Sequence, residues 1–454
     1  MAETLPIGAT ETTLPPAVAS IEPLERETIR RVAWRLMPLL LAGYFCAFLD
    51  RVNVGFAALT MNHQIGLSSA AFGFGSGLFF VGYLCCEVPS NLVLARVGAR
   101  RWIARILVTW GIISGLTAFV WNDWSFYGAR FLLGAAEAGY YPGIVLYMTW
   151  WFPSYYRARI MAIYQSAQTL SLIIGQPISA WLLTLDGSFG LHGWQLLFII
   201  EALPPIVIGG MFWFLLTDHP REATWLRTEQ RAWLQQRLDS ERAQREAVHR
   251  YRLGEALSSP RVWLLTLALF GYTSANSVLN LFLPQIVRSL GVSIQASGFV
   301  AALPYVFGLA VMFYWGRLSD RTGNRTLFVA TAAFAIAAGL AGSSLVGIQH
   351  PVLMMAAMTL AIVGIQSFAA TFWALPTALL SGLAAAGGFA LINSAGNMGG
   401  LVAPSVYGLI KDAAGGSDQL ALLVIACAPV MAGVVVMVLG HDRRLERIPP
   451  TSAA

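Results

Sequence analysis

Long apolar stretches recur along the whole chain and constrain its fold more than any other feature. Each is about as long as the roughly 20 residues that a helix needs to cross the apolar core of a bilayer. Because the stretches are continuous rather than alternating with a period of two, they predict helices and not a β-barrel. Only 11% of the residues are charged, against about 25% in an ordinary soluble domain.

The fold class that follows is an all-α membrane protein with twelve transmembrane helices. We place the spans at residues 36–58, 70–94, 101–121, 124–149, 158–183, 193–216, 262–287, 295–316, 325–347, 351–380, 385–410 and 419–440. Proline interrupts several of them, for example at Pro142, Pro376 and Pro404. Membrane helices tolerate proline because neighbouring helices can satisfy the carbonyl group that it frees.

Basic residues gather in alternate connections between the spans. They occupy the first tail, the connections after spans two, four, six and eight, and the last tail, whereas only Arg288 and Lys411 fall on the other side. Because cytoplasmic loops carry the excess of Lys and Arg, both termini are predicted to lie in the cytoplasm. The net charge of +6 reflects this topology and does not indicate nucleic-acid binding. We expect a multi-pass protein of the cell inner membrane, surrounded by lipid.

An internal repeat divides the chain. Arg321, Gly323 and Arg325 follow span eight, and at an offset of 225 residues they match Arg96, Gly98 and Arg100 after span two. Two six-helix halves are the parallel-repeat plan of a secondary transporter, whose site lies between the halves. The predicted organisation is a disordered cytoplasmic tail at 1–30, an N-terminal half at 31–216, a cytoplasmic linker at 217–260, a C-terminal half at 261–441 and a cytoplasmic tail at 442–454.

Cysteine and histidine give no sign of catalytic or metal chemistry. The four cysteines fall within apolar helices without metal-ligand spacing, and the six histidines map to loops or helix ends. We therefore expect no metal, no cofactor and no enzymatic activity. If protons move through the protein, carboxylates have to carry them.

Charged residues inside the first and fourth spans form the candidate site. Asp50 and Arg51 are adjacent in span one, and a charged side chain near the middle of a bilayer costs roughly 2.5–3.5 kcal/mol even on lenient scales. Arg130 and Glu137 are seven residues apart in span four, which places them on nearly the same helix face. Adjacent helix residues point about 100° apart, so Asp50 and Arg51 are expected to reach across to span four. Two acids and two arginines would then share one layer.

Such a cluster would link proton binding to anion binding. It is neutral when all four groups are charged, so protonating one acid leaves a positive charge that favours an anion. Arginine suits a carboxylate because the guanidinium offers a bidentate fork. The alternative is structural: Arg130 could pair with Glu137 or Asp50 only to lock two helices together. Two further intramembrane acids are Glu87, interpreted as part of a gate or packing network, and Glu201, whose role stays open.

Several stretches resemble a known family. The segment 316–325 resembles the cytoplasmic loop signature of the major facilitator superfamily, and its first-half copy departs from that signature at Asn91 and Ala95. Within the superfamily, three stretches resemble the anion:cation symporter branch, which includes tartrate, phthalate and sugar-acid permeases. These stretches are 48–57, 87–92 together with 97–102, and 130–143. The resemblance covers about 35–440 and implies the major facilitator fold.

The resemblance also implies roles for individual residues. In similar proteins the acids of the first and fourth helices are proton-linked and the adjacent arginine holds substrate, roles that would fall here on Asp50, Glu137 and Arg51. The full set of candidate substrate-binding residues is Arg51, Arg130, Tyr44, Tyr83, Gln168, Asn276, Asn393 and Trp373. For the polar uncharged members, hydrogen bonding between helices is at least as common as ligand contact. The predicted gating residues at cytoplasmic helix ends are Arg96, Arg100, Asp320, Arg321 and Arg325.

The function that these observations predict is proton symport. We expect a monomeric importer of a small organic anion, a carboxylate such as a hydroxy acid, a sugar acid or an aromatic acid, working by alternating access. An organic-anion exchanger or uniporter is the alternative among transporters. A transporter-like membrane receptor is the alternative from another class, although a receptor would normally carry a larger soluble module than residues 217–260 provide.

Overall fold

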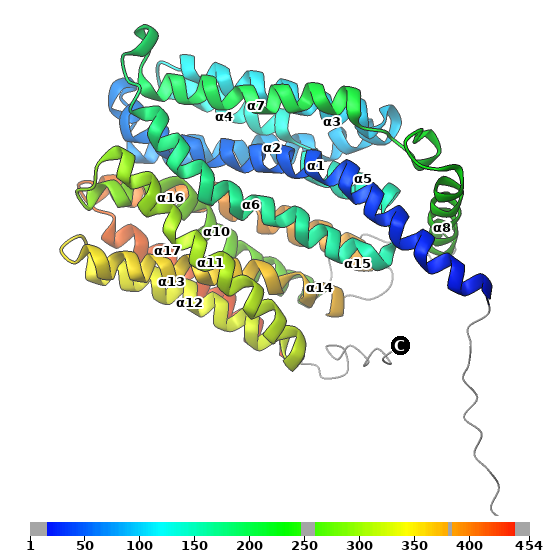
Figure 1. Cartoon of the computed structure of the whole chain (residues 1–454). Coiled ribbons are helices and arrows are strands. Elements are labelled where there is room, and N and C mark those ends of the chain that lie inside the picture. Colours follow the sequence, from blue (N-terminus) through cyan, green and yellow to red (C-terminus); the bar gives the residue numbers. More distant parts are fainter. Residues whose placement is uncertain (1–15, 247–258, 380–383, 441–454) are drawn as a thin grey trace, which may run out of the picture.

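Helices form all the regular secondary structure that the computed structural model describes, in residues 16–246, 259–379 and 384–440. Figure 1 shows most of them as long rods that run in roughly the same direction. The first group is α1 (Pro16–Ile65), α2 (Ser69–Val97), α3 (Ala99–Leu116), α4 (Asp123–Glu137), α5 (Tyr140–Trp151), α6 (Ser154–Leu183), α7 (Gly193–Leu215) and α8 (Thr228–Glu246). The second group is α10 (Pro260–Ser289), α11 (Ile294–Thr322), α12 (Arg325–Val346), α13 (Pro351–Phe372), α14 (Ala374–Leu379), α15 (Ala384–Gly396), α16 (Gly399–Ala413) and α17 (Gln419–Leu439).

Twelve membrane-crossing segments follow from these helices. Within the described ranges, nine segments are long and apolar enough to cross a membrane by themselves. The helix α6 supplies a tenth segment of 30 residues. The pairs α4–α5 and α15–α16 supply the other two, each as a helix with a break inside it. The predicted all-α fold with twelve transmembrane helices in two halves is confirmed.

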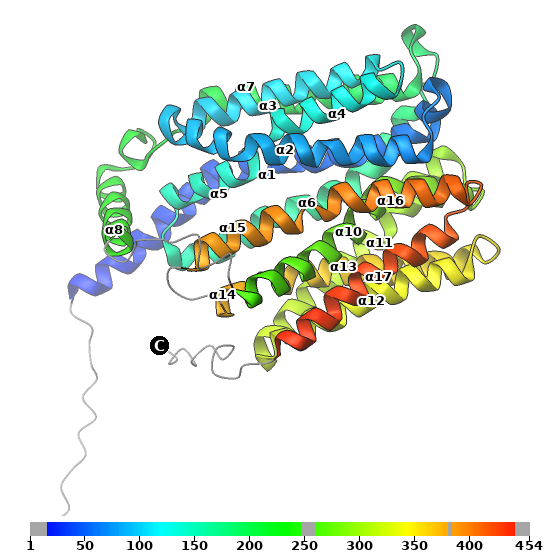
Figure 2. The ribbon, with the colours of Figure 1, turned by 180° about the vertical axis from the view of Figure 1, so that it is seen from behind.

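The two halves pack side by side. In the N-terminal half α2 packs on α4, α3 on α7, and α1 on α6 and α7. In the C-terminal half α12 packs on α13 and α17, and α10 on α17. Among the described residues, the most extensive packing between the halves joins α2 with α16, α6 with α11 and α1 with α10. Figure 2 shows α2 running beside α16. The space between the halves is therefore bounded by helices of both.

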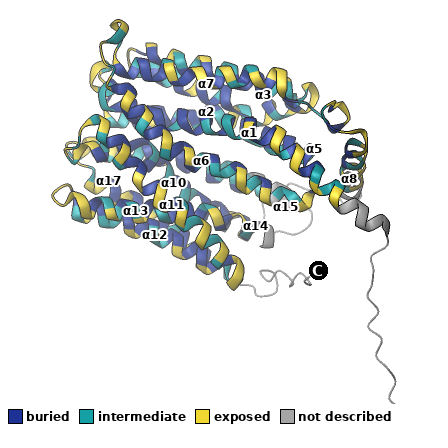
Figure 3. Cartoon of the chain, viewed as in Figure 1, coloured by how far each residue is buried: buried dark blue, intermediate teal, exposed yellow. Residues whose placement is uncertain are grey.

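Large apolar side chains remain exposed on the outside of the bundle. Trp124 and Phe214 are each 80% exposed, and Val438 is 70% exposed. Figure 3 shows buried residues where helices meet and exposed residues on the faces that point outward. Exposed apolar side chains of this size suit a lipid environment rather than water.

One end of the bundle is closed by contacts between the halves. We call it the far end; it carries the turn between α1 and α2, whereas the opposite, linker end carries α8. At the far end Asp412 of α16 accepts hydrogen bonds from the backbone N–H groups of Ser69 (3.0 Å) and Ala70 (2.7 Å). A carboxylate of one half thus caps the first turn of α2 in the other. Nearby, a β-carbon on Gly73 would collide with the carbonyl of Pro404, so the two helices approach closely.

Each of the two loops of the internal repeat begins with a glycine that has a positive φ. The helix α2 ends before Gly98, which has φ 96°, and α11 ends before Gly323, which has φ 68°. Both values lie in the region that glycine adopts at little steric cost. In each loop the next helix then starts almost at once, so the sequence match between these glycines has a conformational cause.

The structure corrects the predicted disordered tail in part and adds a helix to the predicted linker. Residues 16–30 belong to α1 and are helical, not disordered; residues 1–15 and the predicted tail at 442–454 lie outside the described residues. The linker contains the helix α8 as well as loop. Leu234 of α8 is fully buried, and Trp225 just before it stacks on Trp151 of α5 with ring centroids 5.5 Å apart. Packing on the N-terminal half therefore stabilises a helix whose own composition is polar.

Three predicted spans are broken instead of continuous. Span four divides into α4 and α5, span ten into α13 and α14, and span eleven into α15 and α16. The break in span four has a local cause. Gly139 has φ 86°, and a β-carbon there would collide with the hydroxyl of Ser90 on α2. Because α2 approaches so closely, only glycine fits at position 139, where α4 ends.

Candidate functional site

A central cavity lies between the two halves. It has a volume of about 220 Å³ and is lined from α1, α2, α4, α5 and α6 of one half and from α10, α13 and α15 of the other. Its charged lining consists of Arg51 and Arg130, and among the described residues no acid lines it. Amide side chains are the commonest polar lining: Gln165, Gln168, Asn276, Asn280, Asn393 and Asn397.

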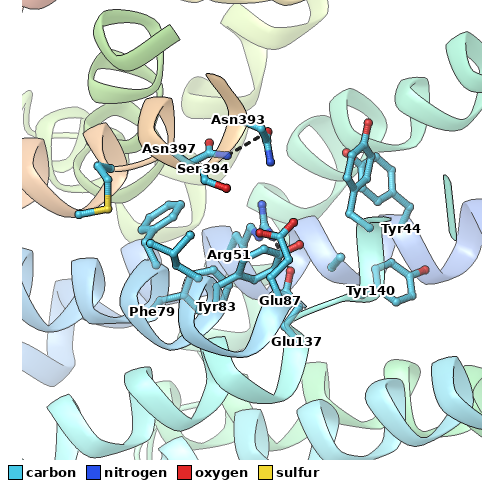
Figure 4. A pocket seen from close by; sticks show the side chains of 15 residues that line it. Tyr44, Arg51, Phe79, Tyr83, Glu87, Glu137, Tyr140, Asn393, Ser394 and Asn397 are labelled. Atoms are coloured by element: carbon cyan, nitrogen blue, oxygen red, sulfur yellow. Dashed lines mark hydrogen bonds and ion pairs between the residues drawn. The ribbon is translucent and has the colours of Figure 1, made fainter. Parts of the chain in front are cut away.

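A smaller cavity of about 140 Å³ adjoins the central one toward the linker end. We call it the side cavity. It shares Arg51, Tyr141, Asn393 and Asn397 with the central cavity, together with Phe79 and Phe80. Figure 4 shows the lining residues, among them Glu87 and Glu137 near Arg51. The two cavities therefore meet at shared residues along the interface between the halves.

Arg51 pairs with Glu137 across the N-terminal half. The Nη2 atom of Arg51 lies 2.5 Å from Oε1 of Glu137. The Glu137 side chain is 2% exposed, whereas that of Arg51 is 29% exposed. The second carboxyl oxygen of Glu137, Oε2, has no hydrogen-bond partner among the described residues. The ion pair therefore uses one acid oxygen and leaves part of the guanidinium facing the cavities.

Arg130 faces the central cavity without an acid partner. It is 3% exposed, forms no ion pair with another described residue, and its Nε has no hydrogen-bond partner there. Its guanidinium carbon lies 5.3 Å from the ring centroid of Phe79, and that of Arg51 lies 5.4 Å from the same centroid. The structural alternative required Arg130 to pair with Glu137 or with Asp50. Arg130 makes neither ion pair.

Asp50 turns away from span four, which corrects the predicted layer of four charges. Its carboxylate is 2% exposed and accepts hydrogen bonds from Trp110 Nε1, from Ser114 Oγ (2.9 Å) and from Asn53 Nδ2 (3.1 Å). It lines neither cavity. Because adjacent helix residues point about 100° apart, the rotation of α1 that brings Arg51 to the cavities turns its neighbour toward α3. The spacing of residues within one helix could not predict that Trp110 and Ser114 of α3 would be the partners of Asp50.

The other predicted substrate-binding residues all line one or both cavities. Tyr44 and Tyr83 line the side cavity, Gln168, Asn276 and Trp373 the central cavity, and Asn393 both. Some of their hydrogen-bonding capacity is used within the protein. The Tyr44 hydroxyl donates to Gln165 Oε1 (2.8 Å), and Asn397 Nδ2 donates to Asn393 Oδ1 (3.2 Å).

With this geometry in view, the comparison with known proteins is direct. Residues 40–404 match the family model for the Major Facilitator Superfamily, which is most of the 454-residue chain. The chain belongs to the major facilitator superfamily.

Named relatives are similar over most of their length. This major facilitator is 46% identical over 419 residues to a proposed tartrate transporter of Agrobacterium vitis, with 92% of this chain and 96% of the relative covered. It is 39% identical over 393 residues to a quinolone resistance transporter of Acinetobacter baumannii, with 86% and 90% covered. These matches identify a membrane transporter and not an enzyme.

A solved structure supports the fold. A bacterial homologue of the human lysosomal transporter Spinster, in an inward-facing and unoccupied conformation, matches with a TM-score of 0.71 and 18% identity. The match covers 93% of this major facilitator and 99% of the homologue. At this level of identity the likeness concerns the fold alone.

The gating candidates of this major facilitator differ in their contacts. Arg325 Nη1 donates to the carbonyl of Ala374 (3.3 Å), which ties the start of α12 to α14. The backbone N–H of Arg100 donates to Asp218 Oδ1 (2.7 Å), so an acid after α7 caps the start of α3. Arg96, Asp320 and Arg321 are exposed and form no ion pair with another described residue. Their gating role stays a prediction.

Several residues of this site were not singled out by the sequence. Tyr141, Tyr272, Gln165 and Asn397 line the cavities. Two of them carried a signal, since Tyr141 lies in the stretch 130–143 and Asn397 follows Asn393 by one helical turn. Glu87, interpreted as a gate or packing residue, is half-buried and lines the side cavity. In the ranges that the structure covers, no cluster of three His, Cys, Asp or Glu side chains could hold a metal ion.

Proposed function

We propose that this major facilitator imports a small organic anion, a carboxylate such as a hydroxy acid, a sugar acid or an aromatic acid, by proton symport with alternating access. The observation that carries the proposal is the charge of the central cavity. Its described lining holds two arginines and no acid. An excess of positive charge in a buried cavity favours an anion, and the planar guanidinium favours a carboxylate because it can donate two parallel hydrogen bonds.

The neutral lining supports a hydroxylated or aromatic anion. The six amide side chains of the central cavity can donate to and accept from hydroxyl groups. Tyr272 and Phe368, whose rings stack with centroids 4.8 Å apart, supply apolar surface in the same cavity. The name of the Agrobacterium relative points to tartrate, a hydroxylated dicarboxylate, and the two arginines could bind one carboxylate each.

Proton coupling in this proposal depends on competition for Arg51. While Glu137 is ionised, it occupies part of the guanidinium. A proton on Glu137 would release the guanidinium for the carboxylate of the substrate. By linkage, the substrate would then favour protonation of Glu137 to the same extent. Asp50 would take part as a second buried acid next to Arg51, and both acids would be deprotonated when the site faces the cytoplasm.

The closed far end supports the alternating-access part of the proposal. Asp412 and the close contact of Gly73 with Pro404 hold the halves together there. The side cavity extends from the central cavity toward the linker end. If the linker is cytoplasmic, as the arginine distribution predicts, this conformation faces inward, and rocking of the halves would open the far end.

The test is uptake by the purified protein in proteoliposomes with an alkaline lumen. We expect radiolabelled tartrate, a sugar acid or an aromatic acid to accumulate, and a lumenal dye to report proton entry that depends on the substrate. Gly128→Ala, a change where a β-carbon meets no atom within 4 Å, is the matched active control. Uptake without proton entry would instead indicate an exchanger or uniporter, and transport of a quinolone but of no small carboxylate would overturn the proposed substrate class.

A further inference from the structure

Glu87 lines the side cavity as an acid without a partner. It lies on α2 and is half-buried. Its carboxylate forms no ion pair or hydrogen bond with any other residue that the structure describes. Figure 4 shows the side chain reaching into the cavity near Arg51. Because partial burial removes some of the hydration of a carboxylate, a charge in this place favours a ligand that brings the opposite sign.

The charges along the interface are divided between the two cavities. Arg51 and Arg130 are the charged lining of the central cavity within the described ranges. Arg51 also lines the side cavity, together with Glu87 and Glu137. Since Arg51 pairs with Glu137, the charges left over are Arg130 at one end and Glu87 at the other. A ligand that is neutral overall but carries one charge at each end would give every group a partner.

The spacing along α2 indicates how far apart these two ends lie. The guanidinium carbons of Arg51 and Arg130 lie 5.4 Å and 5.3 Å from the ring centroid of Phe79. Glu87 follows Phe79 by eight residues, which is roughly 12 Å along a helix axis. Helix side chains lean toward the N-terminus, so the carboxylate of Glu87 returns part of that distance. An amine on the carbon next to a carboxylate would still fall short, whereas an amine several carbons away reaches Glu87.

Aromatic rings make the side cavity suitable for a cation. Five of its lining residues are Tyr44, Phe79, Phe80, Tyr83 and Tyr141. The face of an aromatic ring attracts a positive charge that lies within about 6 Å of its centroid. The Tyr83 hydroxyl makes no hydrogen bond to another residue of the described part of the chain, so its oxygen is available to accept from an ammonium group.

We propose that the two cavities together bind a carboxylate that carries a protonated amine several carbons away. Its carboxylate would lie on Arg130 and on the free part of Arg51, and its ammonium group against Glu87. A second carboxylate in place of the amine would face the like charge of Glu87, so the site selects against a long dicarboxylate. A short dicarboxylate avoids Glu87 by keeping both groups in the central cavity. Transport of such an amine rests on the proposed function, whereas its binding does not.

The first test compares ligands of one length by isothermal calorimetry with the purified protein. The compounds ε-aminocaproate, caproate and adipate differ only at the end away from the first carboxylate, and norleucine carries its amine next to the carboxylate. We expect ε-aminocaproate to bind about tenfold more tightly than caproate, the size of one charge-assisted hydrogen bond. Adipate and norleucine should bind no more tightly than caproate. Equal affinities for ε-aminocaproate and caproate, or no binding of ε-aminocaproate, would overturn the proposal.

The second test assigns the preference to Glu87. Glu87→Gln keeps the shape of the side chain and removes its charge, so the preference for ε-aminocaproate over caproate should disappear and adipate should bind more tightly than to the wild type. An affinity for caproate close to that of the wild type would show that the variant is folded. Glu229→Gln, which changes an exposed acid of α8 outside both cavities, is the matched control and should keep the wild-type preference. The same preference in Glu87→Gln would remove Glu87 from the site.

Uptake in proteoliposomes separates this proposal from the proposed function. If a carboxylate accumulates with protons while ε-aminocaproate binds no better than caproate, only the site for the amine fails. If ε-aminocaproate binds through Glu87 but no carboxylate enters with protons, the proposed function fails and the site remains. When both hold, ε-aminocaproate should inhibit uptake of the labelled substrate more strongly in the wild type than in Glu87→Gln. Equal inhibition in the two proteins would contradict a substrate site that extends to Glu87.

Discussion

The carboxylate of Glu137 and the guanidinium of Arg51 lie 2.5 Å apart, and the two side chains differ sharply in exposure, 2% against 29%. The acid is thus almost fully buried where it lines the side cavity, whereas the base is more accessible and lines both cavities. A guanidinium has five N–H donors, so Arg51 can hold Glu137 with some of them and a substrate with the rest. The affinity of Arg51 for the substrate should therefore depend on the charge of Glu137.

The first prediction concerns Glu137→Gln. In the wild type, affinity for the carboxylate substrate should fall as pH rises, because ionised Glu137 competes for Arg51. The variant has no such competitor, so its affinity should vary little with pH. Coupling energies between sites typically correspond to factors of about 5 to 150, and we expect a change of about tenfold in the wild type across the titration. Isothermal calorimetry at acidic and alkaline pH measures it, and equal pH dependence in both proteins would refute the competition.

The second prediction concerns Arg51→Lys. Lysine keeps the charge but loses the planar fork. The loss of one charge-assisted hydrogen bond, worth about 1.5–3 kcal/mol, corresponds to at least about a tenfold weaker affinity. Calorimetric binding of tartrate, or of the best substrate from the uptake screen, checks this. A melting temperature close to that of the wild type would show that the variant is folded, and undiminished affinity would remove Arg51 from the substrate site.

The third prediction separates coupling from binding at Asp50. Asp50→Asn keeps the shape of a side chain that accepts from Trp110 and Ser114 but cannot bind and release a proton. Proton-driven accumulation in proteoliposomes should fall much more than exchange of substrate across the membrane. Ser114→Ala is the matched control, because it removes one hydrogen bond and keeps the carboxyl. Full accumulation by Asp50→Asn would exclude it from the proton path.

Helix positions were predictable because their cause is local. Each span needs only enough consecutive apolar residues to cross a bilayer. The pairing of Glu137 with the first helix could also be predicted, because charged side chains inside a membrane usually pair with one another. The direction of Asp50 was not, because two adjacent residues cannot face the same neighbour and the sequence does not say which of them turns to the cavity. The orientation of α1 in the folded protein, which turns Asp50 toward Trp110 and Ser114 of α3, decides that.

The broken helices and α8 depended on distant contacts as well. The end of α4 is set partly by Ser90, which lies on another helix and leaves room only for glycine at Gly139. In the same way, the sequence of the linker indicates a charged loop, and the stacking of Trp225 on Trp151 that holds α8 in place is visible only in the structure. Such contacts join residues many positions apart, and composition or periodicity cannot reveal them.

The fourth prediction concerns the closed far end. Asp412→Ala removes the carboxylate that accepts from the backbone of Ser69 and Ala70. Loss of a capping group costs about 1 kcal/mol, which corresponds to about a fivefold change in the ratio of the two conformations in favour of an open far end. Distances between spin labels on α2 and α16, measured by pulsed electron resonance, report this ratio.

Asp418→Ala provides the control for that experiment. Asp418 pairs with Lys411 (2.7 Å) and accepts from the Tyr407 hydroxyl, and all three residues belong to the C-terminal half. Its removal should therefore destabilise that half without shifting the conformational ratio. Equal shifts in both variants would mean that the capping contact does not hold the halves together.

The fifth prediction concerns the contact that positions Glu137 and Arg130. Both lie on α4, whose Gly134 packs against α2 so closely that a β-carbon would collide with the carbonyl of Phe79. Gly134→Ala should push α4 away from α2, at a cost of about 1–3 kcal/mol for overpacking, and should weaken substrate binding because both side chains move with the helix. Gly128→Ala, on the same helix but with no atom within 4 Å of the added carbon, should leave the melting temperature and the affinity unchanged or slightly raised. Thermal melting and calorimetry of the two variants check this directly, and equal behaviour would show that the close approach of α2 and α4 does not hold the site in place.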